Sequence, residues 1–120
     1  MSKPILKSLT EQQALQFKLN GFLVVKDVLD SSEVEIISRQ ADLIASGKAK
    51  HIPKTSIQLE KVFRNDKRAI TNQILSVRKL FNLAVYDSIM WNHVSNEKIV
   101  GIVADLLETS DIKMYGDQLF

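Results

Sequence analysis

The sequence predicts an α+β fold, with helices at its N-terminal end and short strands among and after them. Three observations predict it. A capping box opens a helix at 10–19, apolar residues recur every three or four positions over 32–46, and the last ten residues, 111–120, read as a strand. That strand ends on two apolar residues, and an open strand edge needs a partner. We therefore expect an incomplete fold, in which residues 1–120 are the first part of one larger domain.

The first half of the chain contains two predicted helices and one predicted strand. The helix at 10–19 opens with Thr10 as N-cap and Gln13 as its capping-box partner, and it stops at the next glycine. The apolar, β-branched run 22–25 predicts a buried strand. The helix at 32–46 follows several N-cap candidates and is the most clearly amphipathic segment of the chain.

The second half is less regular. Partial alternation predicts a strand over 56–63, and the charged stretch 65–72 predicts a loop. The apolar run 74–80 fits either a helix or a strand. Asn82 is a candidate N-cap for the next helix, and a second cap signal at 95–98 opens another one. Three of the aromatic residues of this half are expected to pack in the core: Phe81, Tyr86 and Trp91.

The composition is that of an ordinary globular chain, with 45% apolar and 25% charged residues. The net charge of +2 does not predict a nucleic-acid partner. The chain has no cysteine, which excludes disulfides, thiolate metal sites and cysteine nucleophiles. No apolar run approaches the length of a membrane span, and the first residues lack the apolar core of a signal peptide. We expect a cytoplasmic protein.

Neither histidine predicts a metal site in this chain. His51 lies in a polar loop, where a solvated surface residue is the simplest interpretation. His93 precedes Glu97 by four residues, but a metal site needs at least three protein ligands and no third one is near. The serines have no positioned histidine and acid beside them, so no nucleophile is predicted.

The segment 61–79 is the most basic part of the chain. It contains one acid, Asp66, and six basic residues: Lys61, Arg64, Lys67, Arg68, Arg78 and Lys79. Such a cluster can hold a phosphate or carboxylate group. The alternative is a solvated basic face without a ligand. No aromatic residue is interleaved at the tip of this cluster in a stacking pattern, which disfavours nucleic acid.

The last strand contains the best candidate for a binding residue. Side chains alternate along a strand, so Gly116, Gln118 and Phe120 share one face. A glycine within a strand often marks a close approach by another group, and a glutamine can both donate and accept hydrogen bonds. Gln118 is therefore predicted to face a pocket. The alternative is a structural amide bonded to neighbouring backbone.

Three stretches, taken together, resemble the N-terminal part of the phytanoyl-CoA dioxygenase family. They are residues 9–25, residues 29–44 and residues 103–120, the last of which ends on Met114-Tyr115-Gly116-Asp117-Gln118-Leu119-Phe120. Members of this family are oxygenases that depend on Fe(II) and 2-oxoglutarate. The resemblance implies the first strands of a double-stranded β-helix, a jelly-roll of the cupin type. It also implies that the intact protein hydroxylates a small-molecule or lipid-like substrate.

The resemblance implies no iron ligand within these 120 residues. The family holds its iron with a His-x-Asp pair and a distant second histidine, whereas Pro53 and Ser95 stand two positions after the histidines here. The chain then ends before the iron-binding motif, carries no catalytic or metal residue, and is inactive alone. Gln118 remains as a cofactor-binding candidate that faces the pocket.

Two other interpretations stay open. The chain can be a non-catalytic truncated module that folds with a partner, or a small helical adaptor unrelated to oxygenases. Exposed strand edges also predict self-association of the isolated chain.

Overall fold

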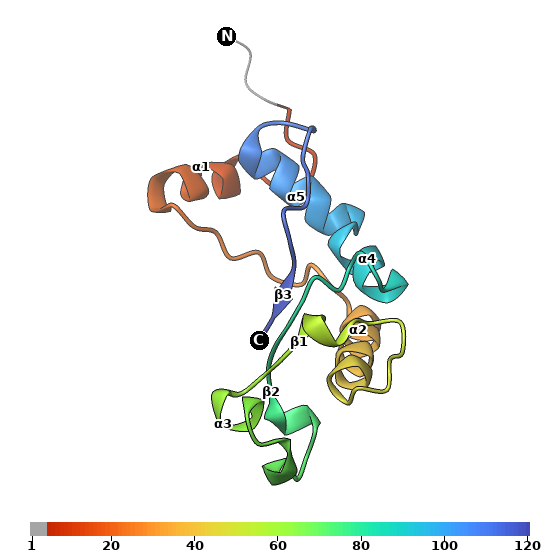
Figure 1. Cartoon of the computed structure of the whole chain (residues 1–120). Coiled ribbons are helices and arrows are strands. Elements are labelled where there is room, and N and C mark those ends of the chain that lie inside the picture. Colours follow the sequence, from red (N-terminus) through yellow and green to blue (C-terminus); the bar gives the residue numbers. More distant parts are fainter. Residues whose placement is uncertain (1–4) are drawn as a thin grey trace.

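Within residues 5–120, which the computed structural model describes, helices and a small antiparallel sheet alternate along the chain (Figure 1). The helices are α1 (Glu11–Asn20), α2 (Ser31–Ala45), α3 (Lys61–Arg64), α4 (Ser88–Val94) and α5 (Glu97–Leu107). The strands are β1 (Ile57–Leu59), β2 (Val77–Phe81) and β3 (Gln118–Leu119). Single 3₁₀ turns lie at Lys54–Ser56, Lys67–Ala69 and Ile74–Ser76.

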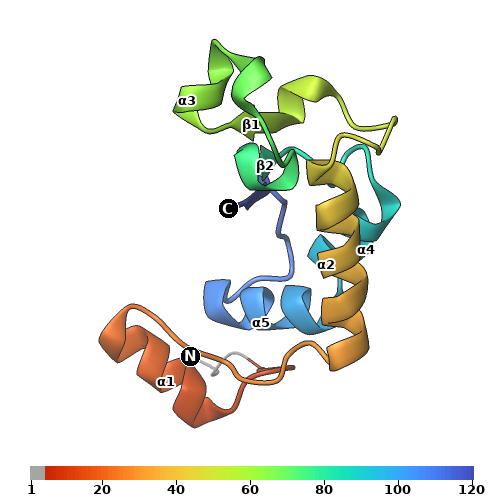
Figure 2. The ribbon, with the colours of Figure 1, turned by 90° about the horizontal axis from the view of Figure 1, so that it is seen from below.

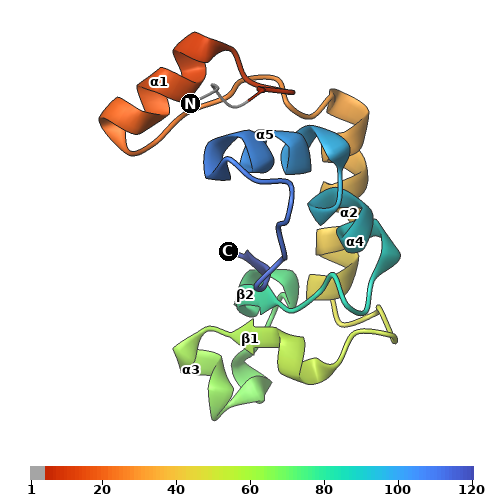
Figure 3. The same ribbon diagram turned by 90° about the horizontal axis from the view of Figure 1, so that it is seen from above.

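The elements form an elongated, open arrangement. Figures 2 and 3 show α1 and α5 together at one end of the molecule and the sheet at the other, with α2 running along one side between them. The molecule measures 62 × 27 × 26 Å, and its radius of gyration is 17.9 Å. A compact domain of this length would have a radius of about 14 Å. The helical end and the sheet end therefore do not close over a common core.

The predicted helices at 10–19 and 32–46 are confirmed to within one residue at each end. The Thr10 hydroxyl accepts a hydrogen bond from the Gln13 N–H, and the Gln13 side-chain oxygen accepts one from the Thr10 N–H, which is the predicted capping box of α1. Gly21 ends that helix in the left-handed region, with a φ of 78°. A second capping box, between Asp30 and Glu33, opens α2.

The predicted strand at 22–25 is wrong. The segment runs extended but pairs with no other strand among the described residues. Phe22 and Val24 are exposed, while Leu23 and Val25 are half-buried against the α5 side chains that include Ile102. The apolar run 22–25 thus belongs to a segment that lies across a helix and not to a strand of the sheet.

The sheet has the order β1-β2-β3, with both pairs antiparallel. The predicted strand at 56–63 is shorter than expected, because α3 begins at Lys61 and a bulge interrupts the pairing between Gln58 and Leu59. The run 74–80, left open between helix and strand, contains a 3₁₀ turn followed by the central strand β2. The chain thus combines helices with an open three-stranded sheet. A double-stranded β-helix remains a prediction.

The predicted strand at 111–120 is correct for two residues. Leu119 pairs with Leu80, and Gln118 pairs with Phe81. The preceding residues are extended without a strand partner, and Tyr115 is fully exposed.

Asn82 does not cap a helix, which corrects the sequence prediction. Its φ is 54°, in the left-handed region, whereas an N-cap residue needs an extended backbone. Asp87 has that backbone, and its side chain accepts the hydrogen bond from the Met90 N–H that opens α4. The amides after Asn82 are instead bound by Asp117, whose two carboxylate oxygens accept from Leu83 and Ala84 at 2.7 and 3.0 Å.

The buried core is small and lies where α2, α4 and β2 meet. Its members are Ile44, Ala45, Ala49, Ile52, Leu80, Leu83, Ala84 and Met90. Tyr86 and Trp91, predicted as core residues, are about half exposed. The whole chain exposes 9330 Å², whereas a folded monomer of its mass exposes about 6,600 Å². Much apolar surface is therefore left uncovered.

One carboxylate attaches the N-terminal segment to α5. Asp105 accepts hydrogen bonds from the backbone N–H groups of Lys7, Ser8 and Leu9, the shortest at 2.7 Å. Burial alone would raise the pKa of Asp105, but these three bonds outweigh it and hold the pKa below its usual value. Gly101 permits the close approach, since a Cβ there would lie 2.3 Å from the Ser8 hydroxyl oxygen.

We predict that Asp105→Asn destabilises the chain by about 1–3 kcal/mol, because an amide cannot accept all three bonds. The folded pKa is lowered, so the carboxylate stabilises the fold fully above its unfolded pKa of about 3.9 and loses that effect below it. In urea unfolding, the free energy of unfolding of the variant should be lower than that of the unaltered chain at pH 7, and this difference should shrink below pH ~4. Asp111→Asn, at an exposed position, is the matched control. Equal losses in both variants would contradict the prediction.

Candidate functional site

The open face of the sheet is the candidate functional site. Register places Gln58 beside Lys79 and Gln118 beside Phe81, and paired residues lie on the same face. Lys79 and Phe81 are two residues apart on β2, so all four share one face, and Phe120 follows Gln118 on it by the same alternation. We call these five residues the open sheet face.

A cation–π arrangement confirms that this face is continuous across two strands. The Lys79 ammonium lies 5.1 Å from the centroid of the Phe81 ring and 5.9 Å from that of Phe120. Lys79 and Phe81 are half-buried, and Phe120 is 84% exposed. The opposite face carries Leu80, which is 4% exposed and packs in the core. One face of the sheet is therefore covered by helices and the other is open.

The open sheet face has the chemistry of a small carboxylate-binding site. It offers one ammonium group and two side-chain amides, between two aromatic rings. An ammonium donates to carboxylate oxygens, and amides can donate or accept beside it. Gln118 is exposed on this face. That it faces a pocket stays a prediction.

His51 is not simply solvated, as the sequence suggested. Its Nε2 lies 2.7 Å from an Asp87 carboxylate oxygen, which also accepts from the Gln40 amide at 2.6 Å. Asp87 is almost fully buried and His51 is half exposed. Burial alone would raise the pKa of Asp87, but the bonds from His51, Met90 and Gln40 outweigh it and leave that pKa lowered. The ionised carboxylate therefore accepts a hydrogen bond from the Nε2–H group of His51 and orients the imidazole.

Sequence reasoning missed this group because its members are far apart in the chain. Gln40 lies on α2, His51 in the following loop, and Asp87 at the start of α4. The one local signal was the position of Asp87 before an apolar run, which is typical of an N-cap. The cluster fastens the loop to both helices and contains no nucleophile.

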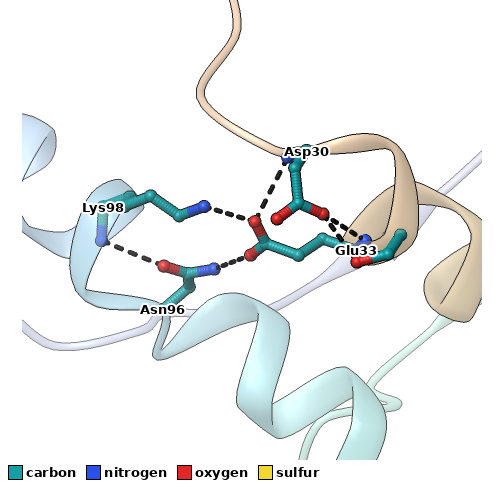
Figure 4. Close-up of polar contacts among 5 residues, drawn as sticks. Asp30, Glu33, Asn96 and Lys98 are labelled. Carbon is teal, nitrogen blue, oxygen red and sulfur yellow. Dashed lines mark hydrogen bonds and ion pairs between the residues drawn. The ribbon is translucent and has the colours of Figure 1, made fainter.

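A second polar cluster joins the starts of α2 and α5 (Figure 4). Glu33 accepts a hydrogen bond from the Asn96 amide at 2.7 Å and forms an ion pair with Lys98. The bonds from Lys98, the Asp30 backbone and Asn96 hold the pKa of Glu33 below its usual value, against the effect of burial. Asn96 also caps α5 through the Lys98 N–H. This cluster satisfies two helix N-termini at once, which is a structural role.

The described residues do not form an iron site. Among residues 5–120, no group of three or more histidine, cysteine, aspartate or glutamate side chains is placed to hold a metal ion. His51 is bonded to Asp87, and the Nδ1 atom of His93 is buried without a hydrogen-bond partner. The residues present therefore do not fit the three-ligand set that the family resemblance implies.

The basic segment 61–79 does not act as one cluster. Arg64 donates to the Leu59 carbonyl, Arg68 pairs with Asp66, and Lys79 lies on the open sheet face. Lys67 instead lines a groove beside the 3₁₀ turns. The fold distributes these charges over several surfaces.

The chain matches no protein-family model, no curated protein and no solved structure. Within residues 5–120, the structure contains no helix both long and apolar enough to cross a bilayer.

We predict that Asp87→Asn lowers the free energy of unfolding by about 1–3 kcal/mol. An asparagine still caps α4, but its NH₂ group cannot accept from the Gln40 amide and His51 together. The measurement is urea unfolding of the chain, with Asp42→Asn on the exposed face of α2 as control. A loss no greater than that of the control would show that the cluster contributes no stability.

Proposed function

We propose that this chain is the N-terminal section of an Fe(II)- and 2-oxoglutarate-dependent oxygenase of the phytanoyl-CoA dioxygenase type. The intact cytoplasmic protein would hydroxylate a small-molecule or lipid-like substrate. In this arrangement the helices support the outside of a β-helix, and β1, β2 and β3 are its first strands. The proposal starts from the resemblance of the three sequence stretches.

The observation that carries the proposal is the difference between the two faces of the sheet. Leu80 is covered by α2 and α4, as the outer side of a barrel supported by helices requires. The other face presents Lys79 and Gln118 without a cover, as an inner face lined with binding groups requires. A strand sequence that only filled a core would carry apolar residues there.

The residues on this face fit 2-oxoglutarate but do not fit iron. Lys79, with Gln58 and Gln118, would hold a carboxylate of 2-oxoglutarate by charge-assisted and amide hydrogen bonds. The described residues supply no ligand set for iron. When bound, the metal and 2-oxoglutarate supply the oxidising chemistry, and this chain contributes orientation of the cofactor and one wall of the site.

The exposed apolar surface of the chain also fits a non-catalytic module that folds with a partner chain. Large apolar side chains are exposed on several elements: Leu19, Phe22, Val62, Leu75 and Phe120 are each more than 60% exposed. A self-sufficient helical adaptor would bury such residues. The exposure therefore disfavours the adaptor and leaves the oxygenase section and the partner-dependent module.

We predict that the isolated 120 residues bind Fe(II) weakly and form no succinate from 2-oxoglutarate, because residues 5–120 contain no group of side chains placed to hold a metal ion. A coupled succinate assay with and without Fe(II) measures this. A second test is to read the coding sequence downstream of Phe120. The proposal requires a His-x-Asp pair within a few dozen residues and a later histidine. Succinate formation by the isolated chain, or the lack of that motif, would refute the oxygenase section.

We predict that the isolated chain self-associates, because the exposed apolar area and open strand edges favour pairing between copies. Sedimentation velocity over a tenfold range of concentration should show a sedimentation coefficient that rises with concentration. A single monomeric species with cooperative unfolding would instead support the adaptor.

A further inference from the structure

A groove bordered by lysines lies on the side of β1 away from the open sheet face. Its volume is about 550 Å³, within the range of small-molecule sites. The apolar residues that line it are Ala49, Ile52, Ile57, Leu59 and Ile70. Ala49 and Ile52 are buried and the others are half-buried, so they form the floor. The groove is thus an apolar depression already formed by residues 47–73.

Three lysines, Lys50, Lys54 and Lys67, line the same groove and are exposed. Within the part of the chain that the structure describes, none of them forms an ion pair. No acidic residue is among the lining residues. Three like charges held around one depression repel each other, and an anion placed among them relieves that repulsion.

The apolar floor and the lysines of the groove together favour one kind of ligand. An apolar floor favours an aliphatic body, and the lysines favour an anionic end. The lining contains no aromatic side chain for stacking, which disfavours a nucleotide base, and no carboxylate, which disfavours a metal ion or a cationic peptide. We propose that this groove binds an amphiphilic anion, an aliphatic chain that ends in one anionic group.

The site is separate from the open sheet face. Ile57 pairs with Leu80 on the core side of the sheet, whereas Gln58 points to the opposite side. The loop that contributes Lys50 and Ile52 is fastened through His51 to Asp87, so the groove does not depend on further strands. The proposal therefore stands or fails independently of the oxygenase proposal.

The first test compares three probes on the unaltered chain by isothermal titration calorimetry. Decanoate has both parts of the ligand, decanol has only the aliphatic body, and acetate has only the anionic end. We expect decanoate to bind at least tenfold more tightly than either of the others. Its affinity should fall as salt is added, because the lysines are exposed to solvent. If decanol bound as tightly as decanoate, the groove would be only an apolar surface. If acetate bound as tightly as decanoate, it would be only a simple anion site. Either result would overturn the proposal.

The second test places the binding in this groove. The double variant Lys54→Met, Lys67→Met should raise the Kd for decanoate roughly tenfold, since each exposed charge contributes about a two- to fivefold effect. Lys26→Met with Lys61→Met is the matched control, because these lysines are exposed and do not line the groove. Ile70→Asp should abolish binding by placing a negative charge on the floor. Circular dichroism confirms that each variant is folded. An unchanged Kd in the groove variant, or no decanoate binding by the unaltered chain at millimolar concentration, would refute the proposal.

Discussion

The buried carboxylate of Asp87 is the point at which three separate parts of the molecule meet. It receives hydrogen bonds from Gln40 on α2, from His51 in the next loop and from the Met90 N–H that begins α4. The apolar core gathers beside it, where Ile44 is fully buried. The core is small, and apolar burial has no preferred direction. The directional bonds to one ionised group supply the geometry, and they do so as long as that group keeps its charge.

Carboxylates that accept hydrogen bonds from distant segments also join other parts of the fold. Asp105 binds three N-terminal backbone amides, Asp117 binds the amides that follow β2, and Glu33 joins the starts of α2 and α5. Each link joins residues at least 30 positions apart and satisfies groups that would otherwise lack a partner. Point contacts of this kind set the direction of a segment without covering its surface. This explains how the chain has defined junctions and still exposes about 2,700 Å² more surface than a compact monomer of its mass.

Sequence reasoning succeeded where the signal was local and failed where a distant residue decided the outcome. The capping boxes of Thr10 and Asp30 lie within four residues, so α1 and α2 were predictable. The strand predicted at 22–25 was wrong because this apolar run lies against helix α5 and pairs with no strand among the described residues. Asn82 looked like an N-cap, but Asp117, 35 residues later, binds the following amides and fixes a turn. On the open sheet face, the strand pattern singled out Gln118, whose binding role stays a prediction. The placement of Lys79 and Gln58 beside it required the register of the sheet, which no local pattern encodes.

The two candidate sites differ in what they need from the rest of the protein. The open sheet face is exposed to water, and an ammonium in water interacts with a carboxylate by only about 1 kcal/mol at contact distance. Cofactor chemistry there requires further structure that excludes solvent and strengthens the same charges. The lysine-bordered groove has an apolar floor already, formed by one continuous stretch of chain that His51 and Asp87 hold in place. Burial of an aliphatic chain on that floor is favourable without any cover over the sheet face. Binding of the proposed amphiphilic anion would therefore depend on residues 47–73 and not on the open sheet face.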